Sequence, residues 1–193
     1  MKSFSLALFA FAASVIAVPQ GGPPTTPTPP APASAPAPAP AKGASATYTI
    51  QTKSTVETLN NKALSAKGGK IGIFPGGSAV KFSSSPYTGG TLSLHPGAED
   101  HQLALSGSKG LLELVDAINP TGEKIASGQS MEWSTFVIDG QGNINVKDGA
   151  DIPTRRWVAY ANPDGSYGVG LYDGFTVPPP KQFLNVTLVA VKA

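Results

Sequence analysis

From residue 44 onward the sequence predicts an all-β domain, arranged as an antiparallel sandwich or a closed barrel, with a trefoil-like barrel as one option. Three observations lead to this prediction. Short stretches in which apolar and polar residues alternate recur about every 8–12 positions, which is the pattern of half-buried strands. This region holds 19 of the chain's 22 glycines, and they indicate, together with the repeated Asp-Gly, Pro-Gly and Gly-Gly pairs, tight turns between those stretches. Only Thr55–Leu64 has a helical pattern, and that pattern is weak.

About ten or eleven strands follow from this alternation. Two neighbouring pairs are joined by hairpin signals, Ser106-Gly-Ser-Lys-Gly110 and Asp139-Gly-Gln-Gly142, and a third pair is joined by Asn162-Pro-Asp-Gly165. Glycine accepts the positive φ that such turns require, so these segments favour antiparallel pairing of neighbours. The expected strands are, in order, Tyr48–Thr52, Ala79–Phe82, Thr91–Leu94, Gln102–Leu105, Leu111–Val115, Phe136–Ile138, Ile144–Val146, Arg156–Tyr160, Tyr167–Tyr172 and Phe183–Val191.

Residues 1–17 are predicted to be a secretory signal peptide. Lys2 precedes an apolar run over Phe4–Val18, and Val15-Ile16-Ala17 offers small residues where a signal peptidase cuts. The alternative is a transmembrane anchor, which needs about 20 apolar residues, and here prolines follow at once. The mature protein is therefore expected to be secreted and extracellular.

Residues 18–43 are predicted to form a disordered stalk rich in Pro, Ala and Thr. Ten of the 23 residues from 19 to 41 are proline, which holds φ near the polyproline value and removes backbone donors. At ~3.1 Å per residue this tract would span roughly 70 Å. The stalk separates the signal peptide from the globular β domain of residues 44–193.

Two kinds of glycosylation are expected on an extracellular chain of this sequence. Asn185-Val186-Thr187 is the only sequon with a permitted middle residue, which predicts N-glycosylation at Asn185. Hydroxyl residues among prolines are typical of O-glycosylated stalks, and the candidates are Thr25, Thr26, Thr28 and Ser34.

The charge pattern excludes two classes of partner. Without Lys2 the chain has 13 basic and 12 acidic groups, which are scattered along the sequence. This pattern has no electrostatic footprint for nucleic acid or for an anionic membrane. Cysteine is absent, which excludes thiol catalysis and zinc–cysteine sites, and the 150 residues from 44 to 193 can bury a core without disulfides. No cofactor is implied, and the sequence does not encode an oligomeric state.

Candidate metal ligands occur together in one segment. His95 and His101 enclose Glu99 and Asp100, and these four residue types could bind zinc or copper. However, Pro96-Gly97 predicts a turn rather than a fixed ligand geometry. A solvated turn is the preferred interpretation, and no metal is predicted.

Catalytic constellations are also lacking. Glycoside hydrolysis needs two carboxylates that face a sugar about 5–9.5 Å apart. Glu113 and Asp116 have odd spacing on one strand and hence face opposite sides, and Asp139 is best explained as a turn residue. Gly76-Gly-Ser78 lacks the strand-to-helix elbow of a serine hydrolase. We therefore expect no enzymatic activity, although the carboxylates available to such a site are Glu113, Asp116, Glu132, Asp139 and Asp151.

Aromatic and polar residues gather in the C-terminal half, which indicates contact with carbohydrate. Sugars stack their apolar faces on exposed rings, while Arg, Asn and Asp bond the hydroxyls. Gly168 and Gly170 share one face of their strand, and such a bare face predicts that an aromatic ring covers it. The predicted glycan-binding residues are Arg156, Trp157, Tyr160, Tyr167 and Tyr172.

Core packing is the alternative for these rings. We favour it over binding for Trp133 and Trp157. For Tyr160 and Tyr172 a surface platform and a place in the core are equally consistent with the pattern.

The order of several segments along the chain is similar to that of a known family. These segments are Gly77–Phe82, Leu111–Asp116, Pro120–Ile125, Phe136–Val146, and Trp157 with Gly168–Tyr172. Over residues 68–173 this order and spacing resemble those of the fungal PhiA-like secreted cell-wall proteins, named for phialide development. That family has an Ile-Asp-x-x-x-x-Leu turn between strands, similar to Ile138-Asp139 and Ile144 here, and it has cysteines that this chain lacks. The resemblance implies a non-enzymatic wall or surface protein that supports asexual development (sporulation) or stress protection.

The sequence therefore predicts a secreted, non-enzymatic cell-wall or surface protein that contacts wall polysaccharide or a wall glycoprotein. The alternatives are a secreted carbohydrate-active enzyme, such as a glycoside hydrolase, and a host-directed effector. A deep cleft with two convergent carboxylates would favour the enzyme, and a shallow aromatic strip would favour the binding protein.

Overall fold

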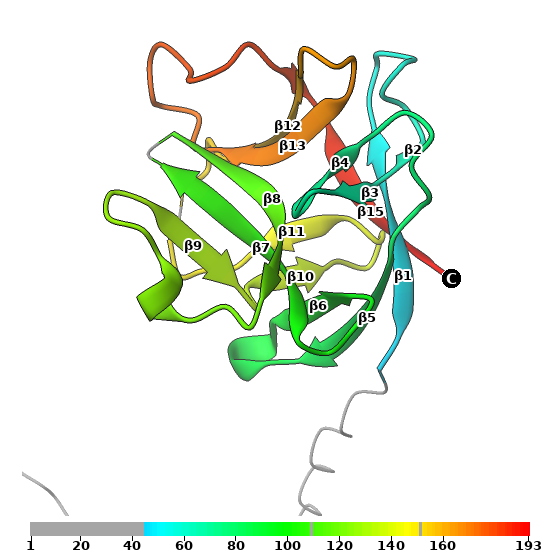
Figure 1. Cartoon of the computed structure of the whole chain (residues 1–193), viewed down its shortest axis with the longest axis vertical. Helices are drawn as coiled ribbons and strands as arrows, with labels where there is room; N and C mark the ends of the chain where they lie inside the picture. The colour runs from blue at the N-terminus through cyan, green and yellow to red at the C-terminus, as the bar shows by residue number, and fades with distance from the viewer. Residues whose placement is uncertain (1–44, 109, 151) are drawn as a thin grey trace, which may run out of the picture. The chain divides into compact units, whose positions relative to one another are not determined.

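The computed structural model describes residues 45–193 except residues 109 and 151 (Figure 1). The predicted signal peptide, the predicted stalk and the O-glycosylation candidates Thr25, Thr26, Thr28 and Ser34 lie outside the described residues. The described part is almost entirely β-structure. It contains no helix with the length and apolar character needed to cross a bilayer.

The first antiparallel sheet has the strand order β11-β10-β6-β5-β1-β15, and β2 pairs with β1 beside this path. Its strands are β1 (Thr47–Lys53), β2 (Lys62–Ala63), β5 (Lys81–Pro86), β6 (Leu92–Pro96), β10 (Phe136–Ile138), β11 (Ile144–Val146) and β15 (Thr187–Lys192). The outermost strands β11 and β15 approach each other through one isolated bridge, between Asn143 and Val189, and no strand ladder joins them.

The second antiparallel sheet has the order β14-β12-β13-β4-β8-β7-β9, with β3 on β4 and an additional pairing of β13 with β8. Its strands are β3 (Ser65–Lys67), β4 (Lys70–Ile73), β7 (His101–Ser108), β8 (Leu111–Ile118), β9 (Ser130–Trp133), β12 (Arg156–Ala161), β13 (Tyr167–Tyr172) and β14 (Leu184–Asn185). Two short 3₁₀ turns, η1 (Thr88–Gly90) and η2 (Gly122–Lys124), lie in the connections. Of the predicted architectures, the chain adopts two antiparallel sheets rather than a closed barrel.

One hydrophobic core joins the two sheets. Phe82 and Phe136 from the first sheet and Leu105 and Leu114 from the second are almost fully buried and belong to the same cluster. Alternate residues of a strand point to the same side, so each strand contributes every second side chain to this core. Burying a side chain of this size stabilises the fold by about 1.5–3 kcal/mol. The core forms in a chain without cysteine.

A second, smaller cluster lies on the opposite face of β12 and β13. Its buried members are Val158, Tyr160, Tyr172 and Leu111 from β8, with Phe183 packed against them. Trp157 and Ala159 alternate with these residues and belong to the main core. The strand β12 is therefore buried on both faces, although a sandwich strand usually exposes one.

The strand predictions are confirmed at all ten positions, with Phe183–Val191 divided into β14 and β15. Thr55–Leu64 forms turns and the short β2 rather than a helix. The strands β2, β3, β4 and β9 were not predicted, because each has only two to four residues and too little alternation to recognise.

Candidate functional site

The predicted glycan platform on β12 and β13 is buried. Trp157 is 6%, Tyr160 3% and Tyr172 3% exposed, so no open aromatic strip forms there. Trp157 lies in the main core, where its Nε1 donates a hydrogen bond to the carbonyl oxygen of Ile144 at 2.7 Å. The core interpretation of Trp157 is confirmed, and its polar atom is already occupied.

Residues 173–183 cover the other two rings. The Tyr172 hydroxyl donates to the carbonyl oxygen of Thr176, and Lys181 Nζ lies 3.8 Å from the centroid of the Tyr160 ring. The Tyr160 ring fills the space beside Gly168, where a Cβ atom would come within 2.2 Å of it. The predicted aromatic cover of the glycine face is thus confirmed, and that cover explains why Tyr160 is not a surface residue.

Arg156 and Tyr167 are less buried, but the structure does not bring them together. The Arg156 guanidinium lies 5.0 Å from the Tyr172 ring centroid and 5.7 Å from that of Phe183. Tyr167 is half-buried and packs against the main core. Arg156 pairs with Tyr172 and Tyr167 with Ala161, at opposite ends of one strand ladder.

The charged groups on this covered face are paired. Glu113 on β8 accepts hydrogen bonds from Lys181 at 2.5 Å and from Lys70 at 3.3 Å. Burial by itself would raise the pKa of Glu113, but the hydrogen bonds from Lys181 and Tyr160 and the charges of the two lysines outweigh it, so the pKa lies below its ordinary value. The face thus has covered rings and compensated charges, which indicates a structural role.

The histidine segment does not form a ligand cluster. His95 Nδ1 lies 3.0 Å from the carbonyl oxygen of Glu99 and 2.9 Å from that of His101, and His95 Nε2 lies 3.0 Å from Ser85 Oγ. His101 Nδ1 lies 2.9 Å from each Asp116 carboxylate oxygen, and this hydrogen bond raises the pKa of His101. In the described ranges no three or more His, Cys, Asp or Glu residues are grouped to hold a metal ion.

Among the remaining carboxylates considered for hydrolysis, Asp139 lies in a turn. Asp139 accepts hydrogen bonds from the backbone N–H groups of Gln141 at 2.9 Å and Asn143 at 2.8 Å, which confirms it as a turn residue. Asp151 lies outside the described residues. Glu132 alone has an unusual environment.

Glu132, Asp148 and Arg155 form a compact group, called here the Arg155 cluster, which the sequence analysis did not identify. Arg155, directly before β12, donates a hydrogen bond to Asp148, and their side chains are 19% and 9% exposed. Glu132 on the edge strand β9 shares a hydrogen bond with Asp148. An edge of the second sheet therefore meets the segment that follows the edge strand β11 of the first.

The two carboxyls of the Arg155 cluster have pKa values that are shifted in opposite directions. Burial raises the pKa of Glu132 to about 7, and the neighbouring Asp148 carboxylate adds to the rise, while the Arg155 guanidinium opposes it. Burial would also raise the pKa of Asp148, but the hydrogen bond from Arg155 holds it below its ordinary value. Near neutral pH the pair thus holds one ionised carboxylate and one carboxyl that can carry a proton.

An open hollow of about 470 Å³, called here the Trp133 groove, adjoins the Arg155 cluster. Tyr87, which follows β5 and is 55% exposed, and the half-buried Trp133 at the end of β9 contribute rings to it. Trp133 belongs to neither hydrophobic cluster, so the core interpretation of this residue is wrong. The complete lining is Tyr87, Met131, Glu132, Trp133, Thr135, Asp148, Ala150 and Arg155.

A buried polar atom near the groove is unusual because it lacks a partner. Thr135 Oγ1 makes no hydrogen bond with any described residue, whereas the neighbouring Glu132 carboxyl bonds to Asp148. Buried polar atoms are nearly always satisfied in folded proteins, and an exception calls for an explanation, of which a bound water, ion or ligand is one.

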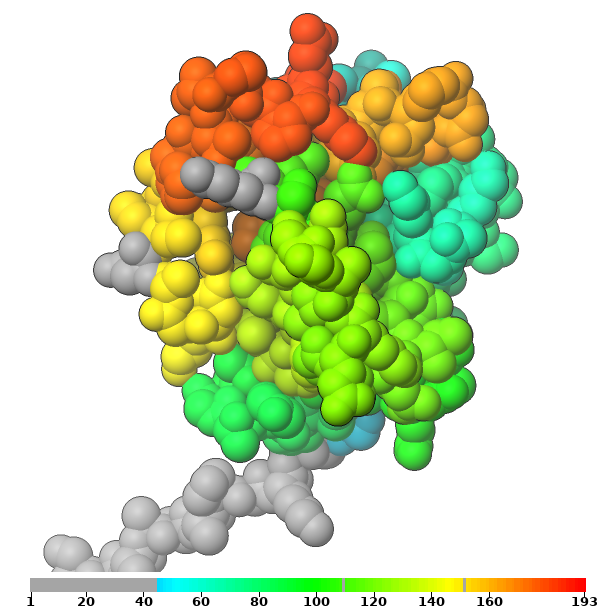
Figure 2. Space-filling view, turned by 60° about the vertical axis from the view of Figure 1, so that its left-hand side comes forward, coloured from blue at the N-terminus to red at the C-terminus, as the bar shows by residue number. Residues whose placement is uncertain are grey.

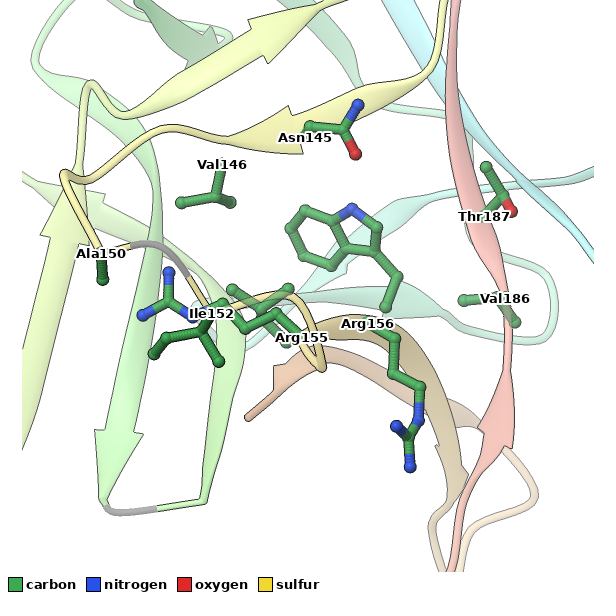
Figure 3. Close-up of a pocket in the computed structure, with 10 residues that line it drawn as sticks. Asn145, Val146, Ala150, Ile152, Arg155, Arg156, Val186 and Thr187 are labelled. Carbon is green, nitrogen blue, oxygen red and sulfur yellow. The ribbon is translucent and has the colours of Figure 1, made fainter. Parts of the chain in front are cut away.

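Further hollows surround Arg155. One of about 390 Å³ is shown in Figure 3, where Asn145 and Val146 from β11 lie across from Val186 and Thr187. The predicted residues Arg156 and Trp157 line it together with Arg155. Figure 2 shows the surface hollowed between the yellow segment near residue 150 and the orange segment near residue 175, where Glu132, Arg155 and Phe175 line a hollow of about 200 Å³.

Comparison of the chain with protein-family models, with curated protein sequences and with solved structures finds no match.

Proposed function

We propose that this chain is a non-enzymatic, secreted cell-wall or surface protein whose β domain binds a polysaccharide in the Trp133 groove. The observation that carries the proposal is the pair of accessible rings, Tyr87 and Trp133, next to the buried Thr135 Oγ1, which has no partner among the described residues. Secretion is supported by the signal-like N-terminal sequence. The resemblance to PhiA-like proteins supports a role in asexual development or stress protection.

The chemistry of the groove suits a neutral sugar. The pyranose faces can stack on Tyr87 and Trp133, while the sugar hydroxyls both donate and accept hydrogen bonds. The Glu132 and Asp148 oxygens that are not used in their shared hydrogen bond can accept, and Thr135 Oγ1 can donate or accept. Because the groove is open rather than enclosed, a polymer can enter it sideways, whereas an enclosed pocket would admit only a chain end.

The Arg155 cluster supports binding over hydrolysis. Glycoside hydrolases hold their two carboxyls about 5–9.5 Å apart on either side of the scissile bond. Glu132 and Asp148 share a hydrogen bond, and Asp148 is held by Arg155. No gap for a sugar separates the two acids, so the pair can bond hydroxyls without acting on both faces of a glycosidic linkage.

Co-sedimentation with insoluble chitin, β-glucan and mannan tests the proposal. We expect the purified chain to bind at least one of them, and Trp133→Ala and Tyr87→Ala to weaken binding at least about tenfold, or ~1.4 kcal/mol. Phe74→Ala is the control, because it also removes a half-buried aromatic ring. The Phe74 ring lies near Lys67, with its centroid 5.9 Å from Lys67 Nζ, and it does not line the Trp133 groove. The proposal would be refuted if the protein bound none of the three polysaccharides with better than millimolar affinity. It would also be refuted if the protein released soluble sugar from any of them.

A further inference from the structure

A second groove lies beside the predicted sequon and shares no lining residue with the Trp133 groove. Its volume is about 540 Å³, within the roughly 300–1,000 Å³ range of small-molecule sites. One wall comes from the end of β1 and the turn after it, and the other from β14 and the start of β15. The lining residues are Lys53, Ser54, Thr55, Asn60, Asn185, Val186 and Thr187. We call this hollow the Asn185 groove.

Strand alternation sends both sequon side chains toward solvent. Val186 is buried, whereas Asn185 and Thr187 on either side of it are exposed. Asn185 is held in place by the pairing of β14 with β12, opposite Val158. Its side chain makes no hydrogen bond with the described residues, so the amide nitrogen is accessible for modification. A sugar attached there starts in the groove and not in the core.

The facing turn offers hydrogen-bonding groups to such a sugar. Asn60 Oδ1 accepts from the backbone N–H of Ser54 at 3.2 Å, which leaves the Asn60 amide hydrogens for another acceptor. Thr55 is exposed and lines the same groove, and it has a hydroxyl that can donate or accept. N-acetylglucosamine has hydroxyls and an acetamido group that complement an amide and a hydroxyl.

We propose that Asn185 carries an N-linked glycan and that its first N-acetylglucosamine sits in the Asn185 groove against Thr55 and Asn60. Attachment forms a bond between Asn185 Nδ2 and sugar carbon C1, while the amide loses a proton and the diphosphate-lipid carrier of the oligosaccharide leaves. The proposal rests on the secretion stated above, because this donor is met in the secretory route. The seated sugar ties the turn after β1 to β15 and thereby stabilises the domain.

Thermal unfolding of protein secreted from yeast tests this seat. An endoglycosidase that leaves one sugar on Asn185 is expected to leave the unfolding midpoint unchanged. Complete removal by an amidase is expected to lower the midpoint by about 2–4 °C, the size of shift that loss of a modest contact causes in a domain of this length. Asn185→Asp is the control for the amidase, because the amidase converts the glycosylated asparagine to aspartate. Thr187→Ala prevents attachment of the sugar, whereas Thr187→Ser keeps the sequon and is expected to keep the unfolding midpoint.

A variant of the seat separates contact from mere attachment. Thr55→Ala is expected to lower the midpoint of the one-sugar form and to leave the sugar-free form unchanged. The proposal is overturned if secreted protein carries no sugar on Asn185, if trimming to one sugar costs as much as complete removal, or if all forms melt together. Any of these results leaves polysaccharide binding by the Trp133 groove intact, whereas protein retained inside the cell would refute secretion itself.

Discussion

Two aromatic regions of this domain differ in how completely their groups are satisfied. On the outer face of β12 and β13, Tyr160 and Tyr172 are covered, and Glu113 is paired with two lysines. In the Trp133 groove the rings of Tyr87 and Trp133 remain accessible, and the buried Thr135 Oγ1 beside them has no partner among the described residues. Covered rings with paired polar neighbours stabilise the fold, whereas accessible rings beside an unpaired polar group can still contact a ligand.

The difference has a topological cause. The segment 173–183 leaves β13 and returns over the same face, where Lys181 and Phe183 complete the cluster. The Trp133 groove instead lies where β9, at the edge of the second sheet, meets the residues that follow β11, at the edge of the first. Sheet edges present incompletely bonded groups, and a groove there is accessible to an extended molecule.

The largest expected effect compares two tyrosines. Tyr160→Ala removes a buried ring that packs on Gly168, so we expect a loss of about 4 kcal/mol in the free energy of unfolding. Tyr87→Ala removes an exposed ring and is expected to change that free energy by less than about 0.5 kcal/mol. Urea denaturation measures both, and equal losses would remove the distinction between the two regions.

Two glutamates should respond oppositely to neutralisation. The pKa of Glu132 is raised from 4.5 to about 7 in the folded state, so its contribution is fully present below about pH 4.5 and is lost as pH rises through 7. The Gln side chain in Glu132→Gln stays neutral at every pH. At pH 8 the free energy of unfolding of this variant should therefore exceed that of the wild type by about 1 kcal/mol, a value reduced to allow for partial exposure to water. The pKa of Glu113 is lowered, so Glu113→Gln should lose stability at pH 8.

Denaturant unfolding at pH 5 and pH 8 measures this pair of effects. The raised pKa of His101 gives a further loss of stability with rising pH, so Glu132→Gln should reduce the wild-type slope without abolishing it. An unchanged slope in Glu132→Gln would show that Glu132 does not hold a proton in the folded state.

A smaller effect is expected from the lysine that covers Tyr160. Lys181→Met keeps an apolar side chain of similar length but loses the ring contact and the ion pair with Glu113, for a cost of about 1 kcal/mol. Lys67→Met is the control, because the Lys67–Asp164 pair is exposed on both sides and should contribute only a few tenths of a kcal/mol. Equal unfolding free energies for the two variants would contradict a structural role of segment 173–183.

Local pattern was sufficient for much of the fold. Alternation and turn glycines predicted the long strands, the hairpin at Asp139 and the ring over Gly168, because these depend on neighbours in sequence or on the adjacent strand. The burial of Tyr160 depends on Lys181 and Phe183, which reach it only through the path of segment 173–183. The Arg155 cluster likewise joins Glu132 and Arg155 from opposite sides of a long stretch of chain, which no spacing rule anticipates.

The two tryptophans provide the most direct test of the central claim, since Trp133 lines the groove and Trp157 lies in the core. The variants Trp133→Phe and Trp157→Phe are to be titrated with soluble oligosaccharides of the polysaccharide that the protein binds best, and the tryptophan fluorescence is recorded at each step. We predict that Trp157→Phe keeps a saturable change in emission and that Trp133→Phe loses it. A saturable change that persists in Trp133→Phe and vanishes in Trp157→Phe would contradict binding in the Trp133 groove.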